Sequence, residues 1–304
     1  MTEQTKAALI TLIGPPNAGK STLINQIVGE KVSIVSPKVQ TTRSRVRGVL
    51  TEDDTQLIFT DTPGLFVPKK KLERAIVRAA EEGVGDADAI CVILDAARKD
   101  CAEKLEFLLQ YFPPAGTRPV YLILNKIDMI DTKQLLALSQ KLNGIYEFTG
   151  TFMISAETGN GVSDMLKTLK GAAPEGPWLF PEDQLSDLPA RLMAAEITRE
   201  HLFRRLHQEL PYQLTVETES WETFDNGDAK LSQVIYVTRE GHKGIILGKQ
   251  GQTLKTIATA ARKEMEDLLD QRIHLNVFVK VREKWMDDPE RFSYWGLSSF
   301  EGEV

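Results

Sequence analysis

Residues 8–28 read ALITLIGPPNAGKSTLINQIV, and they decide the fold of the first half of the chain. The apolar run 8–13 leads into residues 14–21, which match the pattern G-x-x-x-x-G-K-[ST] and open a helical pattern over 21–28. In this context the glycines let backbone N–H groups wrap phosphates at a helix N-terminus. The stretch therefore predicts a strand, a phosphate-binding loop and a helix.

Side chains of this loop are predicted to act on the phosphates and on cations. Lys20 adds a positive charge at the β- and γ-phosphates, and the Ser21 hydroxyl ligates Mg²⁺. Asn17 is predicted to help hold K⁺ near the bridging oxygens, and the alternative is that it only braces the loop. The nucleotide-binding residues predicted here are Gly14, Pro15, Pro16, Asn17, Ala18, Gly19, Lys20, Ser21 and Thr22.

The rest of the first half alternates short apolar runs with amphipathic segments. This alternation predicts an α/β fold, with a mostly parallel sheet covered on both faces. The predicted strands are 8–13, 57–60, 89–94, 120–124 and 152–154, and the predicted helices are 21–28, 72–82, 103–112, 133–142 and 162–169. Ligands of such sheets bind at the carboxyl ends of the strands, where the other motifs of this half lie.

The motif DTPG, residues 61–64, follows the predicted strand 57–60. Asp61 is predicted to hold Mg²⁺ through water, and the Gly64 amide to contact the γ-phosphate. Thr42 is predicted to complete the metal shell while the γ-phosphate is present. The alternative is that Thr41 and Thr42 are ordinary loop residues. The site residues predicted in this part of the chain are Thr42, Asp61, Thr62, Pro63, Gly64 and Leu65.

Leu65 stands directly after the DTPG glycine, where many GTPases of this kind carry a glutamine that orients the attacking water. Because a leucine side chain cannot hydrogen-bond to water, slow intrinsic hydrolysis is expected. The residues predicted to take part in the chemical step are Asn17, Lys20, Thr42, Asp61 and Gly64.

Two further motifs predict that the base is guanine. NKID, residues 125–128, ends the strand 120–124, and the Asp128 carboxylate can accept from both the ring N–H and the exocyclic amine of guanine. An unpaired buried acceptor costs roughly 1–3 kcal/mol, so ATP should be rejected. SAE follows the last strand, and the Ala156 amide is predicted to meet the guanine carbonyl. These motifs contribute Asn125, Lys126, Ile127, Asp128, Ser155, Ala156 and Glu157.

The alternation of apolar runs and amphipathic segments ends at about residue 171. The segment 171–190 contains prolines and glycines and is predicted to be an interdomain linker. The elements predicted beyond it are a helix over 191–210, strands over 212–216 and 234–238 joined by a turn at 225–228, a short apolar turn at 244–247, a helix after 251 and a strand over 273–281. Their order, α-β-β-α-α-β, predicts a second, α+β domain.

The sequence GKQG, residues 248–251, has the form of the GXXG loop by which KH domains clamp single-stranded nucleic acid. The window 239–263 contains six basic residues and one acidic residue, although the net charge of the chain is −6. Together with the predicted α-β-β-α-α-β order, this loop predicts RNA binding. The alternative is an ordinary basic surface exposed to solvent. The predicted RNA-binding residues are Lys243, Gly248, Lys249, Gln250, Gly251 and Lys255.

Length and composition favour two soluble globular domains. The chain has 304 residues, of which 42% are hydrophobic and 26% charged, which argues against disordered and fibrous classes. It shows no membrane-length apolar run and no secretion signal, so a cytoplasmic location is expected. Cys91 and Cys101 are predicted to be packing residues. Four aromatic residues near the C-terminus are predicted to cover a core edge rather than to stack on bases: Trp285, Phe292, Tyr294 and Trp295.

Taken together, these motifs resemble those of the Era family, bacterial GTPases with a C-terminal type II KH domain. The likeness is carried by GPPNAGKS (14–21), QTTR (40–43), DTPG (61–64), NKID (125–128), SAE (155–157), ELPY (209–212) and ILGKQGQTLKTI (246–257). The N-terminal motifs are common to many GTPases, whereas the half from ELPY to GKQG is more particular to Era. Leu65 and Asn17 also fit this family.

The resemblance implies a P-loop GTPase domain at 5–170, a linker at 171–190, a type II KH domain at 191–285 and a tail at 286–304. It implies GTP or GDP and Mg²⁺ as ligands, with K⁺ as a further candidate. The implied function is a GTP-hydrolysing switch that grips the 3′ end of 16S rRNA and assists 30S ribosomal subunit assembly and maturation. A cytoplasmic monomer with peripheral contact to the inner membrane is expected, although the residues show no anchor.

Two alternative functions stay open. The first is a related P-loop GTPase that acts on tRNA modification or on the large ribosomal subunit, which the KH frame disfavours. The second is an RNA chaperone that is stabilised by nucleotide and in which hydrolysis is incidental.

Overall fold

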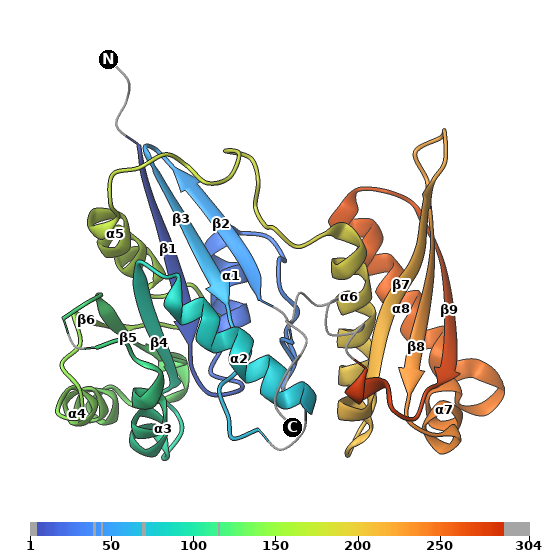
Figure 1. Ribbon diagram of the computed structural model, residues 1–304, viewed down its shortest axis with the longest axis horizontal. Helices are drawn as coiled ribbons and strands as arrows, with labels where there is room; N and C mark the ends of the chain where they lie inside the picture. Colours follow the sequence, from blue (N-terminus) through green and yellow to red (C-terminus); the bar gives the residue numbers. More distant parts are fainter. Residues whose placement is uncertain (1–4, 39–40, 44, 69–70, 115, 289–304) are drawn as a thin grey trace. The chain divides into compact units, whose positions relative to one another are not determined.

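The computed structural model describes residues 5–38, 41–43, 45–68, 71–114 and 116–288 (Figure 1). They divide into two compact units: the first holds the chain up to Ser33 together with Thr42–Asp187, and the second holds Ile34–Thr41 and the chain from Leu188. Gln40 of the QTTR motif and the predicted tail aromatics Phe292, Tyr294 and Trp295 lie outside the described residues. The domain limits expected from the sequence stay a prediction.

The first unit is a six-stranded sheet in the order β2-β3-β1-β4-β5-β6, with parallel pairing throughout except between β2 and β3. Its elements are β1 (Lys6–Ile13), α1 (Lys20–Val28), β2 (Val46–Glu52), β3 (Thr55–Asp61), α2 (Lys71–Gly85), β4 (Ala89–Asp95), α3 (Cys101–Leu108), β5 (Val120–Asn125), α4 (Thr132–Asn143), β6 (Gly150–Met153) and α5 (Val162–Ala172). The mostly parallel α/β fold is confirmed.

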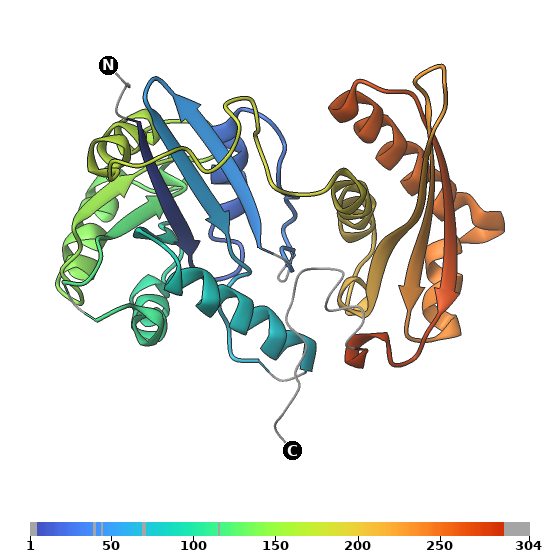
Figure 2. The same cartoon turned by 45° about the horizontal axis from the view of Figure 1, so that its top comes forward.

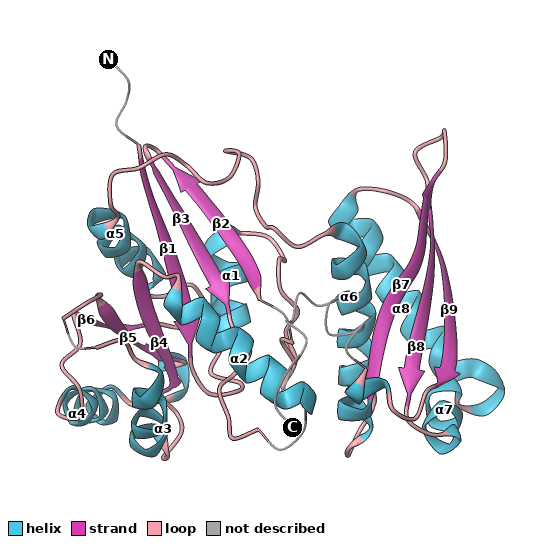
Figure 3. Ribbon diagram, in the orientation of Figure 1, coloured by secondary structure: helices cyan, strands magenta, loops and turns pink. Residues whose placement is uncertain are grey.

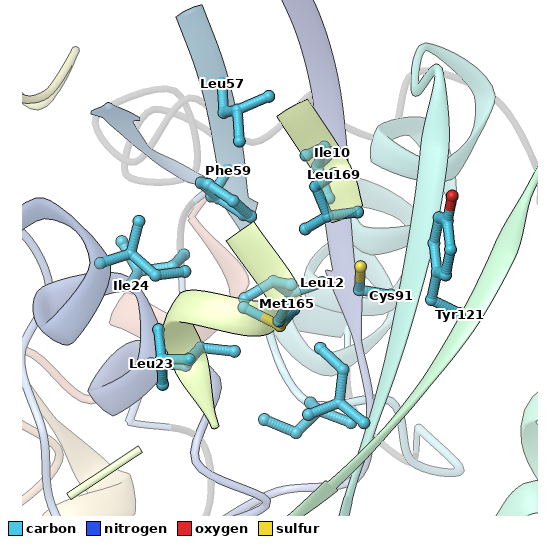
Figure 4. Packing of buried hydrophobic residues seen from close by; sticks show 14 of the residues in the cluster. Ile10, Leu12, Leu23, Ile24, Leu57, Phe59, Cys91, Tyr121, Met165 and Leu169 are labelled. Atoms are coloured by element: carbon cyan, nitrogen blue, oxygen red, sulfur yellow. The ribbon is translucent and has the colours of Figure 1, made fainter. Parts of the chain in front are cut away.

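Helices cover both faces of this sheet (Figure 2). One core packs α1 and α5 against residues such as Ile10, Leu12 and Phe59 (Figure 4). The other core packs α2, α3 and α4 against Val92 and Leu122. Successive residues of a strand point to opposite faces, so buried parallel strands must be apolar throughout. This requirement explains why the apolar runs in the sequence located the strands of this unit.

Both cysteines are buried with free thiols. Cys91 lies in the core under α1 and α5, and Cys101 begins α3. Burial raises the pKa of the Cys91 thiol to about 12 and that of Cys101 to about 11. Neither thiol is ionised near neutral pH, so both behave as packing groups.

Strand β2 was not predicted. It pairs antiparallel with β3 from Val46 opposite Asp61 to Glu52 opposite Thr55. A side chain at Gly48 would place Cβ 2.5 Å from a methyl carbon of Ile24, so glycine lets α1 pack closely on this strand. The glycine and the polar residues around it interrupt the apolar pattern that marks the other strands.

Residues 173–187, inside the predicted linker, belong to the first unit. The buried Gln56 side chain donates to the Phe180 carbonyl at 2.9 Å, and its oxygen accepts from the amides of Leu179 and Phe180 at 2.9 and 3.0 Å. A β-bridge joins Gly48 to Ser186. This segment is therefore ordered by hydrogen bonds to β2 and β3.

The second unit has the predicted order α-β-β-α-α-β (Figure 3). Its elements are α6 (Ala190–Arg205), β7 (Leu214–Thr223), β8 (Ala229–Val237), α7 (Glu240–Leu247), α8 (Gln252–Leu269) and β9 (Ile273–Val281). The sheet runs β7-β8-β9, antiparallel between β7 and β8 and parallel between β8 and β9. Apolar side chains of α6 and α8 pack with those of the strands to form its core.

Several boundaries in this unit differ from prediction. The strands predicted over 212–216 and 234–238 are longer, since β7 runs on to Thr223 and β8 begins at Ala229. The helix expected over 191–210 ends at Arg205, because Leu206 is extended and Gln208 has φ of 57°. Leu206 and Leu210 remain buried in the same core, which explains why the apolar spacing suggested a longer helix. The apolar turn expected at 244–247 is the end of α7.

Helix α6 buries charged side chains that hold the segment Ile34–Thr41, which belongs to the same unit. Arg199 is 1% exposed, pairs with Glu196 and donates to the Thr41 carbonyl oxygen. Glu200 is fully buried and accepts from the Val35 amide at 3.4 Å. The segment is therefore fastened to α6 through its backbone.

Among the described residues, no helix combines the length and the apolar character that crossing a membrane requires. Trp285, the first residue of the short turn after β9, is fully buried, and its indole N–H donates to the Gln213 carbonyl oxygen at 3.3 Å. This tryptophan covers the core of the second unit rather than offering a stacking surface.

Candidate nucleotide site and candidate RNA-binding loop

Four predicted motifs lie at the carboxyl ends of strands in the first unit. The loop 14–21 follows β1, DTPG follows β3, NKID begins at the last residue of β5, and SAE follows β6. Because β1, β3, β5 and β6 belong to the parallel part of one sheet, these ends share one edge. The fold therefore brings together segments that are up to about 140 residues apart.

The loop after β1 needs its glycines for space as well as for conformation. A Cβ at Gly14 would lie 2.4 Å from the Ile93 carbonyl oxygen. Gly19 has φ of +100°, and a Cβ there would lie 2.1 Å from Asn125 Nδ2. Any larger residue would push the loop away from the ends of β4 and β5.

Lys20, the first residue of α1, is 6% exposed. Its Nζ donates to the carbonyl oxygens of Gly14 and Pro15, both at 3.1 Å. Burial lowers the pKa of Lys20 to about 8, and the nearby Asp61 carboxylate opposes that shift. An ammonium has three donors, so one remains for a phosphate oxygen after these two contacts.

Hydroxyl groups converge on one oxygen of the fully buried Asp61. Ser21 Oγ lies 2.6 Å from Oδ2, and Thr42 Oγ1 lies 3.2 Å from Oδ2 and 3.1 Å from Ser21 Oγ. The other oxygen, Oδ1, is buried without a hydrogen-bond partner. Burial raises the pKa of Asp61, while the Lys20 charge and the hydroxyl donors oppose the rise.

This donor set fits Mg²⁺. The ion prefers oxygen ligands and is usually held by one or two protein groups together with substrate phosphates and waters. The unpartnered Oδ1 of Asp61 and the two hydroxyls next to Oδ2 supply such oxygens. No group of three His, Cys, Asp or Glu side chains that could hold a metal occurs in the described part of the chain.

Ser33 is a site residue that the sequence analysis missed. Its hydroxyl donates to Asp61 Oδ2 at 2.8 Å, and the residue is 3% exposed. The two residues are 28 positions apart, and Ser33 belongs to no recognised motif. Only the packing of the segment after α1 brings this hydroxyl to the carboxylate.

The DTPG motif packs closely on the first loop. A Cβ at Gly64 would lie 2.7 Å from the Pro16 nitrogen, so only glycine fits there. Thr62 Oγ1 donates to the Leu12 carbonyl oxygen at 2.6 Å, and the Leu65 amide donates to the Gly14 carbonyl oxygen at 3.1 Å. The Leu65 side chain is 2% exposed within the core under α2 and α3, so it cannot position water.

The base-binding motifs are joined by Asn125. Its Nδ2 donates to the Ala18 carbonyl oxygen at 2.8 Å, and its Oδ1 accepts from the Ala156 amide at 2.9 Å. Lys126 has φ of 65°, and its Nζ donates to Asp95 Oδ2 at 2.6 Å and to the Asn17 carbonyl oxygen at 3.0 Å. These bonds tie the loop after β1 to the NKID and SAE motifs.

The Asp128 side chain is exposed, and its carboxylate accepts no hydrogen bond from the described residues. It is therefore available for a base that offers two donors. Asn17 is also exposed, and it adopts φ of 65°. Its backbone carbonyl oxygen accepts from Lys126 Nζ.

The GKQG sequence forms a sharp loop between α7 and α8. Gly248, Gln250 and Gly251 have φ of 68°, 50° and 75°. A Cβ at Gly248 would lie 2.1 Å from Thr253 Oγ1, so this glycine is needed for space as well. Lys249 and Gln250 are exposed, and Gly251 caps the start of α8, where backbone N–H groups suit a phosphate.

Part of the positive charge around this loop is paired. Lys243 lies 3.9 Å from Glu240, Arg239 lies 3.4 Å from Glu209, and Arg262 lies 2.6 Å from Glu266. The exposed cations of the window without such a pair are Lys249, Lys255 and Lys263. The free positive charge is therefore smaller than the composition of the window suggests, and it is centred on α8 and the loop.

Family models match both halves of the chain. Residues 9–126 match a family described as a 50S ribosome-binding GTPase, and residues 209–286 match the KH domain family. The GTPase Era of Brucella melitensis biotype 1 is 53% identical over 97% of this chain and 94% of its own length. The GTPase Era of Dinoroseobacter shibae is 51% identical over 98% of this chain and 97% of its own length.

Two solved structures are similar over almost the whole chain. An Era variant of Aquifex aeolicus bound to GDP and AlF₄⁻ is 37% identical, with a TM-score of 0.91, over 97% of this chain and 100% of its own. Era in complex with MgGDPNP and nucleotides 1506–1542 of 16S ribosomal RNA is 38% identical, with a TM-score of 0.90, over 97% of this chain and 99% of its own.

Proposed function

Because the chain belongs to the Era family of GTPases, we propose that its GTP cycle controls how the KH unit binds the 3′ end of 16S rRNA. By this binding it assists assembly and maturation of the 30S subunit. The observation that carries the proposal is one chain with a guanine-nucleotide site in its first unit and a GKQG loop in its second. A relative of the same length has been solved with MgGDPNP and a 16S rRNA segment.

The first unit hydrolyses GTP by positioning and by charge. Ser21, Thr42 and Asp61 would hold Mg²⁺, which would supply positive charge for the phosphates. Lys20 adds a fixed positive charge, and the Gly64 amide contacts the γ-phosphate. Since the Leu65 side chain is buried in the core, no glutamine-like group orients the water at this position, and intrinsic hydrolysis is slow.

A potassium ion near Asn17 is proposed to supply further positive charge at the bridging oxygens. The Asn17 side chain is exposed, as access of a cation to it requires. Turnover is expected to be faster in potassium buffer than in sodium buffer of equal ionic strength. Equal turnover in the two buffers would leave Asn17 as a bracing residue.

The second unit is proposed to grip single-stranded RNA through its GKQG loop. KH domains clamp the nucleic-acid backbone with such a loop, and the exposed Lys249 and Lys255 supply charge for phosphates. The contact residues are proposed to be Lys243, Gly248, Lys249, Gln250, Gly251 and Lys255. Lys243 would have to release Glu240 in order to reach a phosphate, which makes its contribution the weakest of the three lysines.

The segment Ile34–Thr41 supports coupling between nucleotide and RNA binding. It is fastened to α6 of the second unit, whereas the next residue, Thr42, hydrogen-bonds to Asp61 of the first. A change at Thr42 when the γ-phosphate is lost is therefore transmitted along the chain to the contacts with α6. Ordering of such loops by a γ-phosphate is a known kind of switch.

The proposal is tested by the affinity for the 3′-terminal 16S rRNA segment with GDP, with a non-hydrolysable GTP analogue and with neither. The GTP analogue is expected to strengthen binding by about tenfold over GDP, within the usual range of allosteric coupling. Equal affinity in all three states would contradict a GTP-controlled grip, even if RNA binding itself were tight.

One finding favours the rival function at the large subunit, namely the description of the family that matches residues 9–126. Crosslinking of the full chain to ribosomal RNA in cells separates the two. We expect crosslinks to the 3′ end of 16S rRNA, and crosslinks confined to 23S rRNA would favour the rival. The chaperone alternative would win if Lys20→Ala abolished GTP binding and yet left cellular function intact.

A monomer in the cytoplasm with peripheral contact to the inner membrane completes the proposal. This part is supported only by the family resemblance. Sedimentation of the full chain with and without vesicles of anionic and zwitterionic lipid would test it. Absence of co-sedimentation with either vesicle would remove the membrane contact from the proposal.

A further inference from the structure

Asp61 is surrounded by three hydroxyl groups, and one of them differs from the others in how it is held. Ser21, Ser33 and Thr42 all lie within 3.2 Å of Asp61 Oδ2. The hydroxyls of Ser21 and Thr42 also lie 3.1 Å from each other, and both are predicted ligands of the metal. Ser33 is not part of that pair, and its shortest contact with the site is its hydrogen bond to Oδ2.

Ser33 is held by the side chain of Asn25 from α1. Asn25 Oδ1 accepts from the amides of Val32 and Ser33, both at 2.9 Å, and Asn25 Nδ2 donates to the Ser33 carbonyl oxygen at 2.8 Å. Asn25 lies four residues after Ser21 and therefore on the same side of the helix. The backbone of Val32 and Ser33 is thus tied by three bonds to the helix that carries Lys20 and Ser21.

The three hydroxyls therefore depend differently on the nucleotide. Thr42 follows the segment Ile34–Thr41, which belongs to the other unit, so its position can change with the state of that segment. Ser33 is the last residue of the first unit before this segment, and Asn25 anchors it there. The two residues that anchor Ser33, namely Asn25 and Asp61, both belong to the first unit.

We propose that Ser33 is a positioning residue of the magnesium site, held by Asn25. It donates to Asp61 Oδ2 in every nucleotide state and keeps the carboxylate oriented with Oδ1 free for the cation and its waters. This inference builds on the magnesium–GTP site of the proposed function and adds a residue outside the recognised motifs. It also assigns Asn25 a role in metal binding through Ser33.

The test measures release of a fluorescent GDP from the full chain as Mg²⁺ is titrated, and again in excess EDTA. For Ser33→Ala, the Mg²⁺ concentration that half-maximally slows release is expected to rise about tenfold, as loss of one hydrogen bond to a charged group implies. The release rate in EDTA should stay within about twofold of the unchanged chain, because the bonds of the base-binding motifs are intact.

Three further variants distinguish a role of Ser33 in metal binding from a general loss of packing. Asn25→Asp retains an acceptor for the amides but loses the donor to the Ser33 carbonyl, so a smaller shift in the same direction is expected. Thr11→Val is the matched control, because Thr11 is a buried hydroxyl of the same unit that donates to the Gly83 carbonyl and does not touch Asp61. Ser33→Thr, which restores a hydroxyl, should restore part of the Mg²⁺ response.

Equal Mg²⁺ responses of Ser33→Ala and Thr11→Val, at equal loss of thermal stability, would overturn the proposal and leave Ser33 as a packing residue. A shift confined to Ser33→Ala and Asn25→Asp would support it. If GDP release from the unchanged chain did not respond to Mg²⁺ at all, the magnesium site of the proposed function would itself fail. That result is visible before any variant is compared.

Discussion

At the level of single residues, base selection is predicted to depend on the Asp128 carboxylate. The side chain is exposed at the sheet edge and accepts no hydrogen bond from the described residues, whereas the neighbouring Asn125 and Lys126 are engaged in bracing the loops. We therefore expect position 128 to supply the base contact, whereas positions 125 and 126 brace the loops around it. The two functions can be separated by mutation.

Asp128→Asn is expected to weaken GTP binding by about tenfold to a hundredfold, because a charged acceptor for two donors is replaced by an amide. Binding of xanthosine triphosphate should strengthen, since its 2-carbonyl accepts from the new amide donor. Competition against a fluorescent GDP measures both. Asp131→Asn is the control, because Asp131 only caps α4 by accepting from the Lys133 amide at 2.8 Å. Unchanged preference in Asp128→Asn would contradict the guanine-binding role.

A second residue-scale prediction concerns His242, which is buried in α7. Its Nε2 accepts from Arg239 Nε at 2.6 Å, so that nitrogen must be unprotonated. Burial, reinforced by the Arg239 charge and opposed by Glu209, lowers the pKa of His242 below its ordinary value of 6.5. The unfolded chain therefore takes up a proton near pH 6.5 and the folded chain only at lower pH.

The free energy of unfolding is thus expected to be at its full value above pH 6.5 and to fall as the pH drops below it. Urea unfolding of the second unit, followed by its fluorescence at about pH 7.5 and about pH 5.5, measures whether the free energy of unfolding falls as expected. His242→Gln should flatten the dependence, whereas His207→Gln, at an exposed position, should not. A wild-type stability that rose towards pH 5.5 would show that other groups dominate.

At the level of elements, the loop between α7 and α8 combines conformation with charge. Gly248 is needed for its positive φ and for the space that Thr253 occupies, so a Gly248→Asp variant would add strain to charge repulsion. Lys249 is exposed and carries no such backbone constraint. Charge reversal at Lys249 therefore isolates the electrostatic part of RNA binding.

Lys249→Glu is expected to weaken single-stranded RNA binding by about tenfold or more at low salt and to reduce the salt dependence of the affinity by about one phosphate contact. GTP hydrolysis without RNA should be unchanged. Lys167→Glu, the same change at an exposed position of α5, serves as the control. Similar losses in the two variants, measured by fluorescence anisotropy, would point to net charge rather than to the loop.

Secondary structure was predictable where a single physical signal dominated. The strands of the parallel sheet are buried on both faces and appear as apolar runs, and β9 alternates as a half-buried strand should. Strand β2 contains Gly48 and polar residues, so its pairing with β3 could not be anticipated from pattern. Helix α6 is shorter than predicted from the sequence, because Leu206 and Leu210 lie in the core beyond the end of the helix and continue its apolar spacing.

At the level of the whole molecule, the chain passes from the second unit to the first between Thr41 and Thr42. Arg199 of α6 donates to the Thr41 carbonyl oxygen, and the Thr42 hydroxyl donates to Asp61. Helix α6 therefore holds the residue that directly precedes Thr42, the residue predicted to respond to the γ-phosphate. The coupling should therefore respond to Arg199.

Arg199→Lys is expected to retain GTP binding and to reduce the ratio of RNA affinities between the GTP-analogue and GDP states to about twofold or less. Lysine keeps the positive charge beside Glu196. It lacks the planar guanidinium group, which in Arg199 donates to both the Glu196 carboxylate and the Thr41 carbonyl oxygen. Arg205→Lys, on the same helix at an exposed position, is the control. A wild-type ratio in Arg199→Lys would show that coupling takes another route.

Local patterns were sufficient for the α/β class, the α-β-β-α-α-β order, the nucleotide motifs and the GKQG loop, because each is encoded in contiguous residues. Three features needed the tertiary structure: Ser33 on Asp61, the buried Gln56 that orders residues 173–187, and the buried charges of α6. Each is a polar group whose partner lies far away in sequence. From the sequence alone, such a group is expected to be exposed to solvent. Only the tertiary structure shows which distant donor or acceptor replaces the hydrogen bonds to water that the group loses on burial.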